Sequence, residues 1–487
     1  MKNKLDIPYG LKKHKPSLRA HEIIINMKYK SIFALILLSI AFTRLSVAQI
    51  SKINQDDIKI KAPFEIPVFK VPNFEHCKNY DIRDFGARQG DKESTTTAIA
   101  KAIVLATTSG GNIIIPPGEW STKAIHLKSN VNLHVSAGAT LLFSGDPKDY
   151  LPAVHSSWEG LECYNYSPLI YAYEATNVAI TGKGTIKADL TVWEKWFPRP
   201  KPHMESIKNL YNWAQEGMPV EQRLMVNDTS NLRPQFIQFN RCQHVRVEDI
   251  KIRNSPFWTL HLYLTKDALI RGIDIYAHGH NNDGIDPEMS QNVLIENCVF
   301  DQGDDAIALK SGRNPEGWRL KTPTKNIVIR NCEIRDGHQL LAVGSELSGG
   351  IENIYVNNCT VLPNEKLMHL LFIKTNERMG GYVKNIYFSK IKAQNVKEGI
   401  LGIDTDVLYQ WRNLVPTKVK KLTPITNVYL SHIKAEVGQF VSKINGNPEL
   451  PIQTIRLKDV HLKKTTSTAI QNKYVNDFSY TNSDKSE

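Results

Sequence analysis

A nine-residue phrase of alternating character recurs along the second half of the chain, and it limits the possible folds more than any other feature. Its eight copies begin at residues 244, 267, 292, 326, 353, 385, 427 and 454, and typical copies read NVLIENCVF, NIVIRNCEI and NIYVNNCTV. Apolar residues alternate within a copy, as at Val293 and Ile295, which is the period of a strand with one buried face. Recurrence every two to four dozen residues predicts stacked coils rather than a two-layer domain.

The composition of the copies separates the two kinds of solenoid. The copies are rich in Ile, Val and Tyr, several begin with Asn, and they show little sign of a 3.6-residue period. These features favour short strands over helices. We therefore predict an all-β, single-domain, right-handed parallel β-helix. Longer spacings, such as the one between Asn385 and Asn427, predict loops inserted on one face, which in solenoids is often the binding face.

Asparagine and cysteine occupy the same place in three successive copies. The pairs are Asn297-Cys298, Asn331-Cys332 and Asn358-Cys359. We interpret them as an internal ladder, in which Asn side chains bond along the stack and Cys fills space as a small apolar residue. The six cysteines include no CxxC pair, so neither a disulfide scaffold nor a zinc or redox motif is indicated.

The whole chain divides into four predicted segments. Residues 1–48 form a leader and signal peptide, residues 49–79 an N-terminal extension, residues 80–475 the β-helix, and residues 476–487 a polar tail. Within the β-helix, residues 95–106 read as a helix that covers the open end of the solenoid.

The leader predicts export. A short basic start, residues 27–30 with two lysines, precedes an apolar run at residues 31–42. The small residues Ser46 to Ala48 offer a cleavage site. The run is too short to span a bilayer, so we expect no membrane span and a periplasmic or secreted protein. Residues 1–48 also carry +7 of the net charge of +12, which leaves 12 − 7 = +5 and gives no support to nucleic-acid binding.

Two acidic stretches exceed what the fold needs. They read NNDGIDP at residues 281–287 and GDDAIALK at residues 303–310. If Ile285 and Ile307 are equivalent inward positions, about one coil apart, Asp283 lies beside Asp305 with Asp304 one place before. Three clustered carboxylates raise at least one pKa, which suits a general acid. Acidic loop caps or a calcium site are the alternatives.

The motifs resemble those of glycoside hydrolase family 28, the polygalacturonase family. Asn281-Asn282-Asp283, Gly303-Asp304-Asp305, Gly337-His338 and Ile373-Lys374 follow the order of the family motifs NTD, G/QDD, GHG and RIK. Further likeness lies in DFGA at 84–87, NSPFW at 254–258 and GSELSGG at 344–350. The resemblance covers roughly residues 80–465 and is specific, because four motifs stand in register.

The resemblance implies a role for each matching residue. Asp304 would be the general acid, Asp283 and Asp305 would activate water in an inverting mechanism, and His338 would tune the acid. Lys374 would pair with a galacturonate carboxylate. The alternatives are a loop histidine for His338 and a snorkelling surface lysine for Lys374. The implied substrate is a pectic polysaccharide or oligogalacturonide, with no metal or cofactor and a monomeric enzyme.

The chain departs from the family pattern near the site. Phe372 replaces the arginine of RIK, so Arg378 is a candidate replacement, or Phe372 stacks on a neutral sugar and a rhamnogalacturonan is the substrate. Gln339 replaces the third residue of GHG. We assign Asn281, Gln339, Phe372 and Arg378 to substrate binding.

Other residues near the motifs have two readings. Trp258 is assigned to sugar stacking, although core packing explains it as well. His278 and His280 show a spacing that could bind metal. The insertion at residues 188–235 is long enough to wall off one end of a groove, which favours cutting from a chain end. A β-helix polysaccharide lyase and a non-catalytic carbohydrate-binding protein are the competing functions.

Overall fold

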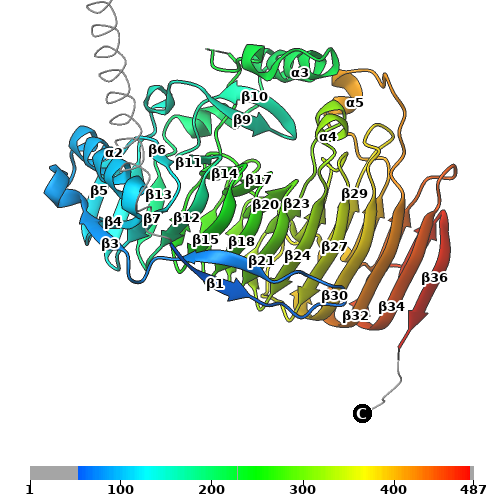
Figure 1. The fold of residues 1–487 in the computed structure, drawn as a ribbon. Helices are drawn as coiled ribbons and strands as arrows, with labels where there is room; N and C mark the ends of the chain where they lie inside the picture. Colours follow the sequence, from blue (N-terminus) through cyan, green and yellow to red (C-terminus); the bar gives the residue numbers. More distant parts are fainter. Residues whose placement is uncertain (1–52, 228, 483–487) are drawn as a thin grey trace, which may run out of the picture. The chain divides into compact units, whose positions relative to one another are not determined.

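The computed structural model describes residues 53–482 except residue 228. The predicted leader and signal peptide lie outside the described residues. The described chain winds into a right-handed parallel β-helix, which confirms the predicted fold (Figure 1).

Strands from successive coils pair in parallel along the helix axis, in an 11-stranded sheet and a 21-stranded sheet within the described residues. The 11-stranded sheet runs through β6 Ile125–Leu127, β11 Ile170–Tyr173, β14 Ile237–Asn240, β17 Leu260–Tyr263, β20 Ile285–Glu288, β23 Ile307–Leu309, β26 Gln339–Val343, β29 His369–Lys374, β31 Gly399–Asp404, β33 Phe440–Asn445 and β35 Ile470–Lys473.

The 21-stranded sheet contains two lines of strands. One line runs through β3 Lys78–Asp81, β4 Gly111–Ile115, β7 Val131–Val135, β12 Thr176–Thr181, β15 Gln243–Glu248, β18 Lys266–Arg271, β21 Gln291–Glu296, β24 Thr324–Arg330, β27 Ile351–Asn357, β30 Val383–Asn395, β32 Ile425–Gly438, β34 Ile452–Thr465 and β36 Val475–Thr481. The other runs through β5 Gly118–Thr122, β8 Ala139–Phe143, β13 Thr185–Ala188, β16 Lys251–Arg253, β19 Asp274–Ala277, β22 Val299–Gln302, β25 Glu333–Asp336 and β28 Thr360–Val361, and joins β30.

The repeated phrase supplies the core. In the first line of strands, Val293 lies opposite Ile327, and Ile295 opposite Ile329, so that each apolar position meets its equivalent on the next coil. These side chains are buried. Their burial fixes the register, because a shift of one residue would turn them all to solvent.

Asparagine side chains form a ladder where the copies begin. Asn326 donates to Asn292 at 3.0 Å, Asn353 to Asn326 at 3.1 Å, Asn385 to Asn353 at 3.0 Å and Asn427 to Asn385 at 3.0 Å. All five have positive φ angles near 60°, which asparagine tolerates better than most residues. Within the predicted Asn-Cys ladder, Asn358 donates to Asn331 at 2.8 Å. Cys298, Cys332 and Cys359 are buried, as expected.

The predicted capping helix is α2, Lys92–Ser109, at one end of the coil (Figure 1). Asp91 begins it by accepting hydrogen bonds from the backbone of Glu93 and Ser94. Its buried face joins the main core and covers strand edges that would otherwise be open.

The two ends of the β-helix differ from the prediction. The first strand, β3, begins at Lys78, and the expected extension before it forms an antiparallel pair, β1 Asn54–Ile58 and β2 Phe69–Asn73. Apolar residues of this pair pack on the outer face of the 21-stranded sheet. The prediction that a polar tail begins at residue 476 is wrong up to residue 481. There β36 pairs with β34, and alternate residues, including Phe478 and Tyr480, pack on the core.

Several inserted elements cover one side of the coil. They are the hairpin of β9 Val154–Trp158 and β10 Leu161–Asn165 and the helices α3 Lys201–Gln215, α4 Pro315–Leu320 and α5 Trp411–Leu414. Four short 3₁₀ turns, Ile82–Phe85, Pro147–Tyr150, Trp193–Trp196 and Val220–Gln222, complete the described elements. A separate apolar cluster holds the inserted elements together, with Trp158, Leu210, Phe257 and Trp411 among its members. Among the described residues we find no helix with the length and apolarity needed to span a membrane.

Candidate active site

Neighbouring rungs of the 11-stranded sheet bring the predicted acidic residues together. Ile285 of β20 lies opposite Ile307 of β23, as the sequence predicted. Asp283 precedes β20, whereas Asp304 and Asp305 precede β23, and the backbone of Gly284 donates to the carbonyl of Asp305 at 3.0 Å. The backbone of His338, before β26, donates to the carbonyl of Asp304 at 2.8 Å.

These residues open into a cavity of about 520 Å³ that the inserted elements help to enclose. The cavity is lined by residues of β26, β29, β31 and β33 and by residues of the segments beside and between the strands, including those next to β20 and β23. Of the sequence-predicted residues, it contains Trp258, Asn281, Asp283, Asp304, Asp305, His338, Gln339, Phe372 and Lys374.

Asp304 and His338 form a pair at the cavity surface. His338 Nδ1 lies 3.1 Å from Asp304 Oδ1, and the Asp304 side chain is 21% exposed. The hydrogen bond raises the pKa of His338 despite its partial burial. Burial opposes ionisation of Asp304, but the hydrogen bond and charge of His338 lower the pKa of Asp304 overall. When the pair binds one proton, these opposite shifts place it on His338 beside an ionised Asp304.

Asp283 and Asp305 are more deeply buried than Asp304, with side chains 4% and 2% exposed. Burial raises the pKa of Asp283 to about 7, with Lys310 opposing the shift and Asp304 adding to it. Burial also raises the pKa of Asp305, although Lys374 Nζ lies 3.0 Å from its Oδ2 and opposes the rise. At least one carboxyl pKa is raised, as predicted, but burial is a larger cause than the neighbouring carboxylates. The raised groups are Asp283 and Asp305, whereas the pKa of Asp304, the predicted general acid, is lowered.

A buried polar layer lies beneath the three aspartates. Lys310 Nζ is 3.4 Å from Asp283 Oδ2, 3.4 Å from Asp286 Oδ1 and 3.8 Å from Glu346 Oε2. The same ammonium lies 4.4 Å from the centroid of the Trp258 ring. Burial, together with the charge of Asp283, holds the pKa of Asp286 well above its usual range. Lys310 is therefore the cation that compensates this group of buried carboxyls.

Part of the cavity wall carries a network of ion pairs. Arg313 binds Glu346 and lies 3.6 Å from Glu159, and Arg199 lies 3.6 Å from the other oxygen of Glu159. Arg199 also donates to Asn281 at 3.0 Å. Arg199 comes from the predicted insertion and Glu159 from the turn between β9 and β10, so two inserted elements meet in this wall through charge pairing.

The other predicted binding residues line the cavity in different ways. The Phe372 ring stacks on His369, with centroids 4.7 Å apart, and Gln339 Oε1 accepts from His369 Nδ1 at 3.0 Å. Trp258 is only 2% exposed and belongs to the apolar cluster of the insertions, so its core role is the better supported of the two readings.

Arg378 does not belong to the cavity, and its assignment to substrate binding is wrong. Its side chain is buried and donates to Thr417 Oγ1 at 2.9 Å and to the carbonyls of Trp411 and Val415 at 3.2 and 2.9 Å. It anchors the chain around α5, because it donates to the carbonyl of Val415 and adds a second donor to the carbonyl of Trp411, which also accepts from the backbone of Val415.

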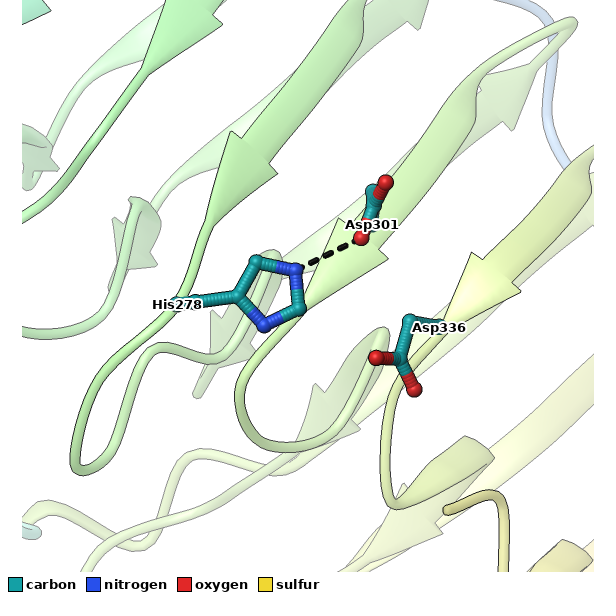
Figure 2. Close-up of side chains that lie close together, drawn as sticks. All are labelled: His278, Asp301 and Asp336. Atoms are coloured by element: carbon teal, nitrogen blue, oxygen red, sulfur yellow. Dashed lines mark hydrogen bonds and ion pairs between the residues drawn. The ribbon is translucent and has the colours of Figure 1, made fainter. Parts of the chain in front are cut away.

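In the part of the chain that the structure describes, two groups of side chains offer metal-ligand atoms within 4.8 Å of one another. One consists of Asp304, Asp305 and His338 in the cavity. The other consists of His278, Asp301 and Asp336, where His278 Nε2 lies 2.6 Å from Asp301 Oδ1 (Figure 2). His280 belongs to neither group, and its Nδ1 lies 3.1 Å from the carbonyl of Phe197. The rings of His278 and His280 therefore do not face one common metal position.

The sequence reading missed several site residues. Lys310 was predictable from the alternation of side chains along the strand. Ile307 and Leu309 point inward, so Ala308 and Lys310 point outward, to the face that carries the cavity. Arg199, Arg313 and Glu159 come from segments without a repeat, where no register relates the sequence to the cavity.

The arrangement defines a class of enzyme. Asp304, paired with His338 at the surface, and the buried Asp283 and Asp305, each beside a lysine, face one cavity, and glycoside hydrolysis uses an acid and a base arranged in this way.

Comparison with known proteins gives the family. Residues 219–482 match the model of glycosyl hydrolases family 28, so the chain belongs to this family and is a glycosidase.

Three similar proteins extend the match over the β-helix. A hyperthermoactive exopolygalacturonase from Thermotoga maritima is 35% identical and superposes with a TM-score of 0.74, over 83% of this chain and 94% of that one. A probable polygalacturonase of Vitis vinifera is 27% identical over 77% of this chain and 72% of the relative. An exo-poly-alpha-D-galacturonosidase of Dickeya chrysanthemi is 25% identical over 66% of this chain and 56% of the relative.

Proposed function

We propose that this glycosidase hydrolyses the α-galacturonosyl linkages of pectic polysaccharide or oligosaccharides with inversion at the anomeric carbon. The observation that carries the proposal is the meeting of Asp283, Asp304, Asp305 and His338 in one cavity. Polygalacturonases among its relatives support the substrate class.

Asp304 acts as the general acid in this proposal. It is the most exposed of the three aspartates and is hydrogen-bonded to His338, which stores the proton. As the glycosidic bond breaks, the proton passes through Asp304 to the leaving oxygen, and the charge of His338 falls as the pair loses its proton. The low pKa of Asp304 is compatible with this role because the proton is stored on the pair rather than on the carboxyl alone.

Asp283 and Asp305 activate the attacking water. Lys310 and Lys374 hold their carboxylates in place at 3.4 and 3.0 Å. A carboxyl with a pKa near 7 is a stronger base, once ionised, than an ordinary aspartate, and so removes a proton from water more readily. Lys374 also lines the cavity, where it can bind a sugar carboxylate as well as Asp305.

The ion-paired wall of the cavity supports attack from a chain end. A polymer that passed through the cavity would need open space beyond the reacting sugar, where Glu159, Arg199 and Arg313 are paired instead. We therefore propose an exo-acting enzyme that releases short products from the start of digestion.

The test is to incubate the purified protein with polygalacturonate, rhamnogalacturonan and reduced oligogalacturonides and to identify the products. The proposal predicts saturated short galacturonides and unchanged activity in chelator. Products with a double bond that absorbs in the ultraviolet would indicate a lyase, and binding without any product would indicate a carbohydrate-binding protein. Long oligomers released early would contradict exo attack.

A second candidate is a rhamnogalacturonan hydrolase. The observation that favours it is Phe372, whose apolar ring faces the cavity where the family motif has an arginine. Faster cleavage of rhamnogalacturonan than of polygalacturonate would establish it.

We also propose that the protein is exported to the periplasm or beyond the cell. The signal-like residues 27–48 support this proposal. N-terminal sequencing of the mature protein should begin at Gln49, and an intact leader on cytoplasmic protein would contradict it.

A further inference from the structure

The cations that line the cavity are matched by carboxylates, with one exception. Arg199 lies 3.6 Å from Glu159, Lys310 3.4 Å from Asp283, and Lys374 3.0 Å from Asp305, while Arg313 binds Glu346. Lys443 also lines the cavity, yet no carboxylate of the described residues, 53–227 and 229–482, is in ion-pair contact with it. Its ammonium lies 5.6 Å from the centroid of the Phe440 ring.

Lys443 shares a row of the sheet with Phe372. Lys443 of β33 lies opposite Gly402 of β31, which lies opposite Phe372 of β29. A Cβ at Gly402 would lie only 2.7 Å from the His369 ring and 2.9 Å from the Phe372 ring. No side chain larger than glycine fits at residue 402 without displacing these rings, so Gly402 lets the His369 and Phe372 rings lie against the sheet between Phe372 and Lys443.

Groups that bind hydroxyls lie in the next row. Asp404 of β31 is opposite Asn445 of β33, and Asn445 Nδ2 donates to Asp404 Oδ1 at 3.1 Å. Both line the cavity, as does Glu398 just before β31. A carboxylate and an amide accept and donate hydrogen bonds in the manner that vicinal sugar hydroxyls require.

We propose that Lys443 binds the carboxylate of a uronate residue next to the reacting sugar, in a subsite formed by Phe372, Gly402, Asp404, Lys443 and Asn445. Phe372 offers an apolar plane to the sugar ring, and Asp404 and Asn445 bind its hydroxyls. The inference rests on the proposed galacturonan activity. It adds that the sugar next to the reacting sugar is also a uronate, whose carboxylate Lys443 binds. Lys443 is suited to this role because binding the ligand breaks no existing ion pair.

The test replaces Lys443 in the full-length enzyme and measures kcat and KM on oligogalacturonides. Lys443→Met keeps the apolar stem and removes the charge, and we expect KM to rise about tenfold with kcat changed less than about twofold. Lys443→Arg should restore KM to within about threefold of the wild type. The increase in KM should shrink at high salt, because the lost contact is electrostatic.

Lys473 provides a matched control. It is an exposed lysine on the next strand, β35, opposite Asn445, but it does not line the cavity. Lys473→Met should leave KM unchanged. An unchanged KM in Lys443→Met, or a Lys443→Arg enzyme as weak as Lys443→Met, would overturn the inference while leaving the proposed function intact. Wild-type protein that does not cleave galacturonides would overturn the proposed function itself.

Discussion

The asparagine ladder and the catalytic rungs both stack side chains from successive coils, but they stack different chemistry. In the ladder, Asn353 donates to Asn326 and accepts from Asn385, and each amide carries no net charge. On the catalytic rungs, Asp283 and Asp305 lie on neighbouring coils as buried carboxyls.

The difference shows how one architecture serves stability and function. Repeating a neutral amide lets each inner side chain donate to one neighbour and accept from the other, so that each rung supports the next. Stacking carboxyls raises their pKa values and demands buried cations such as Lys310, which costs stability. Changes on the catalytic rungs should therefore affect chemistry first, and changes in the ladder should affect only folding.

The largest effect is expected at the acid. Asp304→Asn keeps the shape of the side chain but cannot donate a proton to the leaving oxygen, so kcat should fall by about three to four orders of magnitude with binding of oligogalacturonide retained. Steady-state kinetics and calorimetric titration measure the two quantities. Product formation at the wild-type rate would remove Asp304 from the mechanism.

Loss of the central cation should harm both folding and chemistry. Lys310→Met leaves Asp283, Asp286 and Glu346 without this partner, and we expect the free energy of unfolding to fall by about 3 kcal/mol at pH 8. Denaturant titration measures the change. Lys473→Met is the control, because the Lys473 side chain is outside this network. Equal stability of the two variants would show that Lys310 does not compensate the buried carboxyls.

The pH profile tests the base. Asp283 has a pKa of about 7 and must be ionised to accept a proton from water. The value of kcat/KM should therefore fall as the pH drops below about 7. In Lys310→Met this limb should move to higher pH, because Lys310 lowers the pKa of Asp283. A limb that stays in place in the variant would indicate that another group titrates.

The smallest effect is expected in the ladder. Asn353→Ala removes two amide hydrogen bonds and places alanine at a φ of 59°, so the free energy of unfolding should fall by about 2 kcal/mol with kcat unchanged. Asn353→Gly loses the same bonds without the backbone strain and should cost about 1 kcal/mol. A change in kcat in either variant would contradict the separation of the two regions.

The same comparison explains what the sequence could predict. The repeat relates residues on neighbouring coils, so the facing of Ile285 and Ile307, and with it the meeting of Asp283 and Asp305, follows from counting along the chain. The capping helix followed from its composition. The fold and the acidic centre were therefore predictable.

Where the repeat ends, prediction failed for physical reasons. Arg378 is charged, and charge alone does not show whether an arginine faces a cavity or binds buried carbonyls. The last strand is rich in polar residues because its side chains are largely exposed, so only the alternation of Phe478 and Tyr480 marked it. The partners Glu159 and Arg199 come from different insertions and meet only in the folded chain.

The central claim is that carboxyls on neighbouring coils hold a water opposite the acid, which requires inversion at the anomeric carbon. Proton NMR of oligogalacturonide digestion, recorded before mutarotation, tests this most directly. The account predicts that the β-anomer of the newly formed reducing end appears first from the α-linked substrate. If the α-anomer appears first, the assignment of Asp283 and Asp305 to water activation is contradicted.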